Sequence, residues 1–195
     1  VTLFLFCAGV GQAVAVQEGQ SWARFWRRWA QVAGCAVLVS AGSALMFPAS
    51  WIHFGVLHGV AVMLVLVRLL APLGQSGFPG IALLCGFGLV ALALPHWVSH
   101  SFFDSRLTSV VGLVTRKPVT EDWVPLFPWL GVMLFGLVAG LVVQGRNPTW
   151  LKGGLPGVLD PLAALGRWSL SFYMLHQPVF IGALLAWGWL RSTAG

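Results

Sequence analysis

The sequence predicts an all-α fold: a polytopic transmembrane helical bundle with about six visible spans, in a single domain over residues 1–195. Hydrophobic residues make up 58% of the chain and charged residues only 8%, whereas a soluble domain has about 25% charged residues. A soluble fold of this length could not bury so much apolar surface. Many of the 11 Trp stand at the ends of apolar runs, where a membrane interface places them.

The first apolar segment reaches about residue 16. Residues 17–29 follow as a separate amphipathic piece at the membrane surface, because arginines alternate with aromatic residues there. The second span covers about residues 30–47 and stops at Pro48, and a short turn leads to the third span, about residues 53–70. These lengths are near the roughly 20 residues that cross a bilayer.

A loop over residues 72–79, rich in Gly and Pro, precedes the fourth span at about residues 80–94. We expect this span to end at Pro95, because proline lacks the N–H that would continue the helix. Residues 96–125 form the longest polar stretch, and connections of this length are usually functional or disordered. The fifth span covers about residues 126–144.

Two local patterns predict structure in the last part of the chain: a pair of glycines in the fifth span and a helix start before the sixth. Gly136 and Gly140 lie four residues apart, a pattern that permits close contact between membrane helices. Asp160 followed by Pro161 is a favourable helix N-terminus, so we expect a short helix to lead into the sixth span, about residues 165–190.

The sixth span is unusually polar. A helix would gather four polar residues on one face: Ser169, Tyr173, His176 and Gln177. An unpaired polar group in hydrocarbon costs several kcal/mol, so this face must contact protein or water. Pro178 predicts a kink beside His176. The alternative is that these groups only bind membrane helices to one another, and both readings stay open.

The basic residues predict how the bundle is oriented in the membrane. Most lie on one side, which is cytoplasmic by the positive-inside rule; they are Arg24, Arg27, Arg28, Arg68, Arg146, Lys152 and Arg167. The first span then runs from outside to inside. Because the chain begins at Val1 within an apolar run, we expect one further span upstream.

Four of the five histidines fall at or near the outer side, together with three carboxylates; these are His53, His58, His96, His100, Asp104, Glu121 and Asp122. Histidine and a carboxylate together can form a general base with an orienting partner. Ordinary interfacial residues are the favoured reading of three of these histidines. His58 lies inside an apolar helix, so a functional and a structural role are equally open for it.

Metal binding has little support. His96 and His100 are spaced like zinc ligands on a helix, but the chain has no H-E-x-x-H, and Pro95 disturbs the helix. The odd number of cysteines inside apolar runs predicts small buried side chains and neither disulfides nor metal ligands; they are Cys7, Cys35 and Cys85. We therefore predict no metal cofactor.

The inner basic residues could bind phosphate groups, which guanidinium contacts bidentately. Topology and attraction to anionic lipids explain most of them. Arg167 is the exception, because it opens the polar sixth span. Neither G-x-x-x-x-G-K-[ST] nor G-x-G-x-x-G occurs, so an ATPase or a dinucleotide enzyme has no support. The basic residues form no separate domain, so nucleic acid is not an expected partner.

Three stretches resemble the heparan-alpha-glucosaminide N-acetyltransferase catalytic-domain family, in its bacterial branch. They read FGVLHGVA at residues 54–61, DWVPLFPWLGVMLFG at residues 122–136 and LGRWSLSFYMLHQP at residues 165–178. The opening residues 3–11 look like that family's second span. The resemblance implies that the catalytic histidine of the family lies in a first span upstream of Val1, so the chain as printed is expected to be inactive.

The resemblance also implies an integral membrane acyltransferase, expected in the bacterial inner membrane. Such enzymes transfer acetyl from cytosolic acetyl-CoA to a sugar amine or hydroxyl across the membrane. His58 and Asp122 would then lie near the acceptor, and His176 would line the transfer path. The residues expected to contact the co-substrate are Arg167, Gln177, Tyr173 and Arg28. Eukaryotic members often have Gln where His58 stands, which argues against His58 as an essential base.

Two alternatives remain beside the acyltransferase. A transporter would use the polar residues to line a substrate path, although the chain shows no pair of similar halves. A structural membrane protein would use them only to pack helices. Lipid, an acyl donor and a glycan or other small acceptor are the expected partners, and a homo-oligomer is left open.

Overall fold

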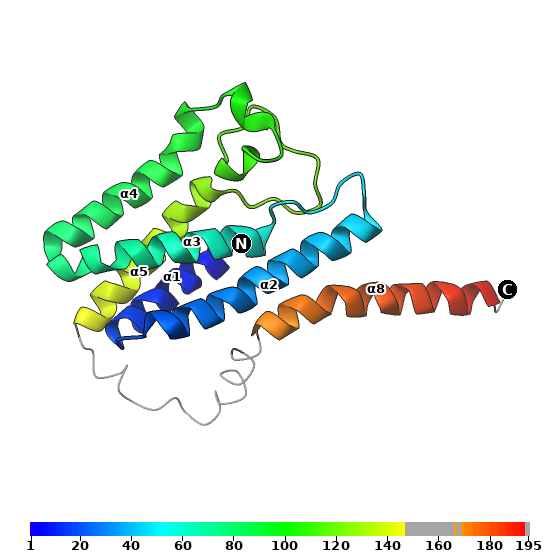
Figure 1. Ribbon diagram of the computed structural model, residues 1–195, viewed down its shortest axis with the longest axis horizontal. Helices are drawn as coiled ribbons and strands as arrows, with labels where there is room; N and C mark the ends of the chain where they lie inside the picture. Colours follow the sequence, from blue (N-terminus) through cyan, green and yellow to red (C-terminus); the bar gives the residue numbers. More distant parts are fainter. Residues whose placement is uncertain (147–165, 167–168, 194–195) are drawn as a thin grey trace. The chain divides into compact units, whose positions relative to one another are not determined.

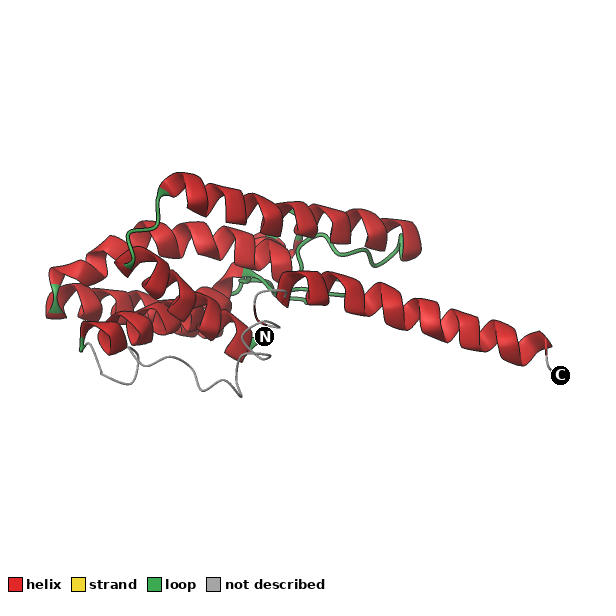
Figure 2. Cartoon of the chain, turned by 90° about the horizontal axis from the view of Figure 1, so that it is seen from below, coloured by secondary structure: helices red, strands yellow, loops and turns green. Residues whose placement is uncertain are grey.

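The computed structural model describes residues 1–146, 166 and 169–193 (Figure 1). The chain divides into two compact units, Val1–Pro148 and Thr149–Gly195, and each is treated by itself. The described residues are helical and contain no β-strand (Figure 2). One isolated parallel bridge joins Phe54 and Trp123. The predicted all-α class is therefore confirmed.

The first unit contains five α-helices and three short 3-10 helices among its described residues. In chain order they are α1 (Thr2–Gln17), α2 (Trp22–Met46), α3 (Val56–Leu70), η1 (Ala71–Ser76), α4 (Phe78–Trp97), η2 (Ser101–Asp104), η3 (Ser109–Val111) and α5 (Leu126–Gly145). The described helix of the second unit is α8 (Ser169–Thr193).

Helices α1 and α5 pack with their backbones in contact. A Cβ atom on Gly136 would lie 2.1 Å from the Phe6 carbonyl oxygen, and one on Gly9 would lie 2.1 Å from the Met133 carbonyl oxygen. Further along, a Cβ on Gly140 would lie 2.5 Å from the Ala13 Cβ. The close contact predicted from Gly136 and Gly140 is confirmed. The contacts pass from Phe6 and Gly136 to Ala13 and Gly140. Residue numbers therefore increase in the same direction along both helices, and α1 and α5 run parallel.

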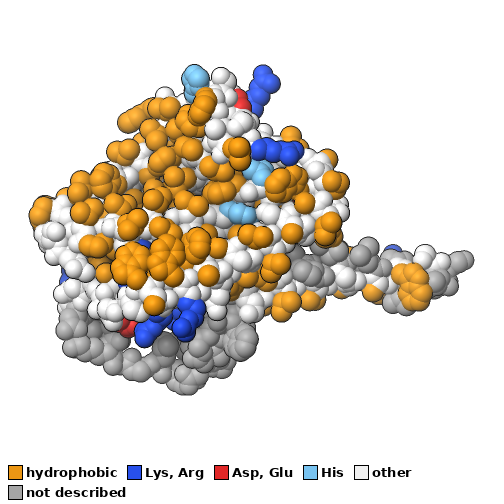
Figure 3. All heavy atoms as spheres, in the orientation of Figure 1, with side chains coloured by type: hydrophobic (Ala, Val, Ile, Leu, Met, Phe, Trp, Pro, Cys, Tyr) orange, Lys and Arg blue, Asp and Glu red, His pale blue; other side chains and the backbone are white. Residues whose placement is uncertain are grey.

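The interior of this unit is formed mainly by α3 and α5. Half of the most apolar stretch in each of them is buried, against 22% for α4 and 6% for α2. The outward faces of α2 and α4 are rich in apolar side chains, and hydrophobic side chains cover much of the face seen in Figure 3. Such a surface suits contact with lipid, as expected of an integral membrane protein.

Among the described residues, four helices are long and apolar enough to cross a membrane: α2, α3 continued by η1 (Val56–Ser76), α4 and α5. Helix α1 has 16 residues, fewer than the roughly 20 that a span needs. Helix α8 has 25 residues and is not among the four. The count of about six spans is therefore not confirmed.

Several predicted boundaries are wrong. Residues 22–46 form one helix, so the separate surface piece does not exist. The Ser21 hydroxyl accepts a hydrogen bond from the Arg24 backbone N–H at 3.4 Å, and the helix continues without a proline to stop it. The third helix begins at Val56, three residues later than predicted.

The fourth span is also longer than predicted, because it continues through Pro95 to Trp97. A proline in the last turn removes only one of the helix hydrogen bonds, so the helix can end beyond it. The loop predicted at residues 72–79 is largely the 3-10 helix η1. In the second unit, α8 is a single helix across Pro178; the kink itself stays a prediction. The predicted helix start at Asp160 lies outside the described residues.

Candidate functional site

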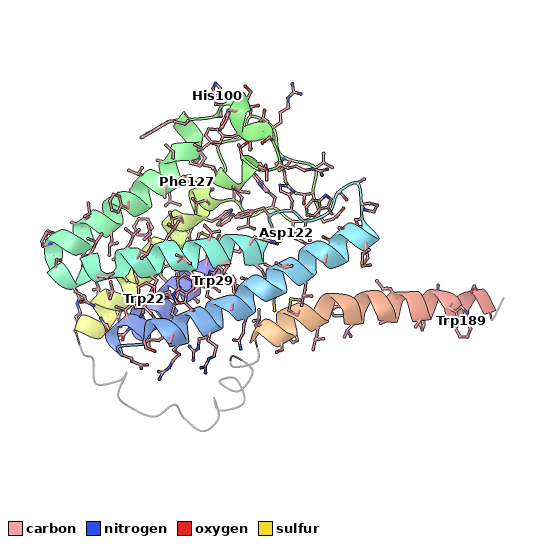
Figure 4. The ribbon with its side chains drawn as sticks, in the orientation of Figure 1. Trp22, Trp29, His100, Asp122, Phe127 and Trp189 are labelled. Atoms are coloured by element: carbon pink, nitrogen blue, oxygen red, sulfur yellow. The ribbon has the colours of Figure 1, made fainter. Side chains whose placement is uncertain are left out.

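Two loop segments join the helix ends that the sequence predicts to face outward, and these segments pair with each other. The Glu121 backbone N–H donates to the Ser50 carbonyl oxygen at 2.9 Å, and the Val124 N–H donates to the Phe54 carbonyl oxygen at 3.3 Å. The Ser50 hydroxyl also donates to the Glu121 carboxylate. This pairing brings Asp122 beside the start of α3, although the two are far apart in the sequence (Figure 4).

Asp122 caps the N-terminus of α3. Its Oδ2 atom accepts a hydrogen bond from the Val56 backbone N–H at 2.7 Å. The first N–H groups of a helix have no partner within it and carry a partial positive charge, so a carboxylate is favourable there. Gly55 permits this approach, since a Cβ atom at that position would lie 2.3 Å from Oδ2.

His58 has both ring nitrogens engaged. Its Nδ1 atom accepts from the Gly55 backbone N–H at 3.4 Å, and its Nε2 atom lies 3.2 Å from the Ser40 Oγ atom. The single Ser40 hydroxyl proton is donated to the Ile52 carbonyl oxygen at 2.6 Å. Nε2 must therefore carry a proton and donate to Ser40, which makes His58 a neutral imidazole with Nδ1 as its basic nitrogen.

Two serines on α2 support this arrangement, and sequence reasoning missed both. The Ser43 hydroxyl donates to the Ser40 carbonyl oxygen and accepts from the Ile52 N–H, each at 3.0 Å. Ser43 is buried and Ser40 is half-buried. Their spacing of three residues in the apolar second half of α2 was the available signal, because it places both hydroxyls on one helical face.

His53 belongs to the same end of the unit but contacts a different segment. Its Nε2 atom lies 3.3 Å from the Ser109 Oγ atom, and the Ser109 hydroxyl donates to the Arg106 carbonyl oxygen at 3.1 Å. Burial and the nearby Arg106 charge lower the pKa of His53 below its ordinary value, and a hydrogen bond with the Trp51 backbone opposes them. Burial therefore favours the neutral form of His53.

Asp104 and His100 shape the long outer loop. The Asp104 carboxylate accepts from the Thr115 hydroxyl at 2.5 Å and from the Thr115 N–H at 2.7 Å. The hydroxyl bond is the largest cause that lowers the pKa of Asp104, and slight burial opposes it. The His100 Nδ1 atom accepts from the Phe102 N–H at 3.1 Å. These contacts give both residues a structural role in the loop.

Among the residues that the structure describes, no group of three or more His, Cys, Asp or Glu side chains could hold a metal ion. Helix α4 ends at Trp97, so His96 and His100 do not share a helical turn. The three cysteines are free thiols. All three were predicted to be buried, but Cys7 is exposed and Cys35 and Cys85 are half-buried.

The basic residues at the other end of α2 are exposed; they are Arg24, Arg27 and Arg28. Arg28 lies twelve residues before Ser40, which corresponds to about 18 Å along a helix. The Trp29 indole N–H donates to the Ala61 carbonyl oxygen at 2.8 Å and so holds this part of α2 against α3 (Figure 4). Of the predicted site residues in the first unit, only His58 and Asp122 come together.

The remaining predicted site residues belong to the second unit. Tyr173, His176 and Gln177 are positions of α8, and their side chains lie outside the description. Arg167 lies outside the described residues altogether. Their assigned roles remain predictions.

Comparison with known proteins agrees with the resemblance seen in the sequence. The sequence model of the family described as heparan-alpha-glucosaminide N-acetyltransferase, catalytic, matches residues 1–178. No curated protein and no solved structure gives a significant match to the chain. The family match covers most of the chain, including α1 to α5 and the first part of α8. The chain therefore belongs to the heparan-alpha-glucosaminide N-acetyltransferase catalytic family, a family of membrane acetyltransferases.

Proposed function

We propose that the protein transfers an acetyl group from cytosolic acetyl-CoA to a sugar amine or hydroxyl on the other side of the membrane. The observation that carries the proposal is the polar cluster at the start of α3, formed by His58, Ser40 and Asp122, in a chain of this acetyltransferase family. In an otherwise apolar bundle, a group of ionisable and hydroxyl side chains is a candidate functional site.

His58 offers a specific chemical role at the acceptor end. Its proton is committed to Ser40, and the bond that Nδ1 accepts from Gly55 is long, at 3.4 Å. An acceptor hydroxyl or ammonium group could replace this weak donor and give its proton to Nδ1. Asp122 would favour the imidazolium that results. In the net reaction, the neutral amine or hydroxyl gains the acetyl group and loses one proton, and the leaving CoA thiolate gains one. An acceptor that enters as an ammonium releases its additional proton to solvent.

The donor side is assigned from the sequence. Arg167 and Arg28 would bind the phosphates of CoA, since guanidinium forms paired hydrogen bonds with phosphate oxygens. His176, with Gln177 and Tyr173, would line the path of the acetyl group. We place this activity in the bacterial inner membrane, with the basic helix ends in the cytoplasm.

The proposal is tested by binding of acetyl-CoA to the full-length protein purified in detergent. Thermal stability is followed against ligand concentration, with Arg167→Ala as the test variant and Arg116→Ala on the outer loop as its matched control. We expect saturable stabilisation of the native protein, of about 2.7 kcal/mol at a hundred times the Kd. It should vanish in Arg167→Ala and persist in Arg116→Ala.

A transfer assay separates the acyltransferase from a transporter. The protein is reconstituted in sealed vesicles with its basic helix ends facing outward. Acetyl-CoA labelled in its acetyl group is added outside the vesicles, and glucosamine is enclosed inside. Labelled N-acetylglucosamine inside the vesicles is the expected product. Movement of glucosamine without acetylation, from a protein that acetyl-CoA does not stabilise, would contradict the proposal and favour a transporter.

A further inference from the structure

Arg68 near the end of α3 is a buried cation with incomplete hydrogen bonding. Only 7% of the residue is exposed. Its Nη2 atom donates to the Gln20 carbonyl oxygen. Its Nη1 atom is buried and has no hydrogen-bond partner among the residues that the structure describes. An unpaired polar atom in such a setting costs free energy unless a further group binds it.

The surroundings of Arg68 contain no anion in the described part of the chain. The guanidinium carbon lies 5.3 Å from the centre of the Trp22 ring and 5.8 Å from that of Phe25, so the cation rests against two aromatic rings. Aromatic rings attract a cation more weakly than a carboxylate does. The positive charge and the free Nη1 donor are therefore both available to an anion.

Trp22 is the part of this enclosure that could move. It stands at the first position of α2 and is 46% exposed, whereas Phe25 is only 3% exposed. Rotation of the Trp22 side chain toward solvent would uncover the guanidinium and would break the ring contacts of Trp22 with Phe25 and Trp26. The exposed Arg24, Arg27 and Arg28 of the same helix add positive potential at this end and would attract an anion to it.

We propose that Arg68 binds a phosphate group through Nη1, with Trp22 as a movable cover over the site. A phosphate oxygen would complete the guanidinium contacts that Gln20 leaves open, and Arg forms its strongest hydrogen bonds with such oxygens. The phosphate belongs either to a lipid headgroup or to a soluble phosphorylated molecule. The inference does not depend on the proposed acetyl transfer.

The test uses the full-length protein in dodecyl maltoside, which contains no phosphate. One arm adds inorganic pyrophosphate, and the other adds phosphatidylglycerol to the micelles, with diacylglycerol as the uncharged control. The thermal unfolding midpoint against probe concentration gives an apparent affinity. We expect at least one phosphate probe to stabilise the native protein, and the responding arm identifies the source.

Arg68→Gln should weaken the apparent affinity by about 10- to 100-fold, because it removes a charge-assisted hydrogen bond. Arg116→Gln, an exposed arginine of the outer loop, should leave it unchanged. If Arg68→Gln does not fold, Arg68→Lys keeps the charge but loses the second donor, and we expect about 10-fold weaker binding. Equal affinity in the native protein and the folded Arg68 variant, or no stabilisation of the native protein by either probe, would overturn the proposal.

Discussion

The two ends of α3 treat polar groups in opposite ways. At the N-terminus, the Val56 backbone N–H donates to Asp122 from the long loop, and His58 is hydrogen-bonded to Ser40 of α2 and to the Gly55 N–H. Toward the C-terminus, Arg68 is more deeply buried but has one nitrogen without a partner. Hydrogen bonds on both ring nitrogens fix the proton position of His58, whereas an incompletely bonded cation can still accept a ligand.

The largest effect expected at the bonded end comes from Gly55→Ala. The new Cβ atom would lie 2.3 Å from Asp122 Oδ2 and 2.7 Å from Ile52 Cγ2, so the carboxylate must leave its position on Val56. We expect a loss of about 2–3 kcal/mol from strain and the lost cap, measured by chemical unfolding in detergent. Gly42→Ala is the matched control, because no atom lies within 4 Å of its Cβ. Equal stability of the two variants would contradict the cap.

Asp122→Ala tests the carboxylate without strain. It leaves the Val56 N–H without its partner, so we expect a loss of about 1–2 kcal/mol in the free energy of unfolding. Asp122→Asn keeps an acceptor oxygen and should lose less. If both variants lose the same amount, the charge, and not the hydrogen bond, stabilises the helix start.

Ser40→Ala removes the partner of His58 Nε2 and should cost about 1 kcal/mol. The more specific readout is the ¹⁵N NMR signal of His58. In the native protein we expect a neutral ring with the proton on Nε2, and in Ser40→Ala a mixture of the two neutral tautomers. An imidazolium signal at pH 7.5 in the native protein would be incompatible with the assigned bonding.

The smallest expected effect is a pH dependence from His53. Its pKa in the folded protein lies below the ordinary 6.5, so the unfolded chain binds more protons as the pH falls through 6.5. Stability should therefore be full above pH 6.5 and decrease between that value and the lower pKa of the folded state. The comparison of unfolding midpoints in native protein and His53→Gln checks this, since the variant should lose that part of the pH dependence.

The sequence predicted the helices that are bounded by strong local signals. The fifth span agrees with α5 to within one residue, because Pro125 precedes it and a continuous apolar run follows. The paired glycines of α5 also lie where predicted, against α1. By contrast, no local signal showed that residues 17–29 and 30–47 would merge, since an amphipathic turn and an apolar run can share one helix.

The site was predictable only in outline. His58 and Asp122 were both placed near the outer face, and the structure brings them to the same helix end. Their actual partners, Ser40 and the backbone of Gly55 and Val56, follow from the pairing of two loops distant in the sequence. Hydrophobic periodicity carries no information about such pairing. The roles predicted for Arg167 and His176 are not tested by the fold.

The backbone contact between α1 and α5 has a mechanical consequence. Side chains can change rotamer and let neighbouring helices slide, but the Gly9 and Gly136 contacts leave no side chain between the two backbones to adjust. A small displacement along the axis would bring carbonyl oxygens into collision with Cα atoms. We therefore expect α1 and α5 to move as one rigid body during turnover. Movement that admits substrate or releases product would more easily come from α2, because α4 also approaches α5 closely, with a Cβ on Gly131 only 2.6 Å from the Gly88 carbonyl oxygen.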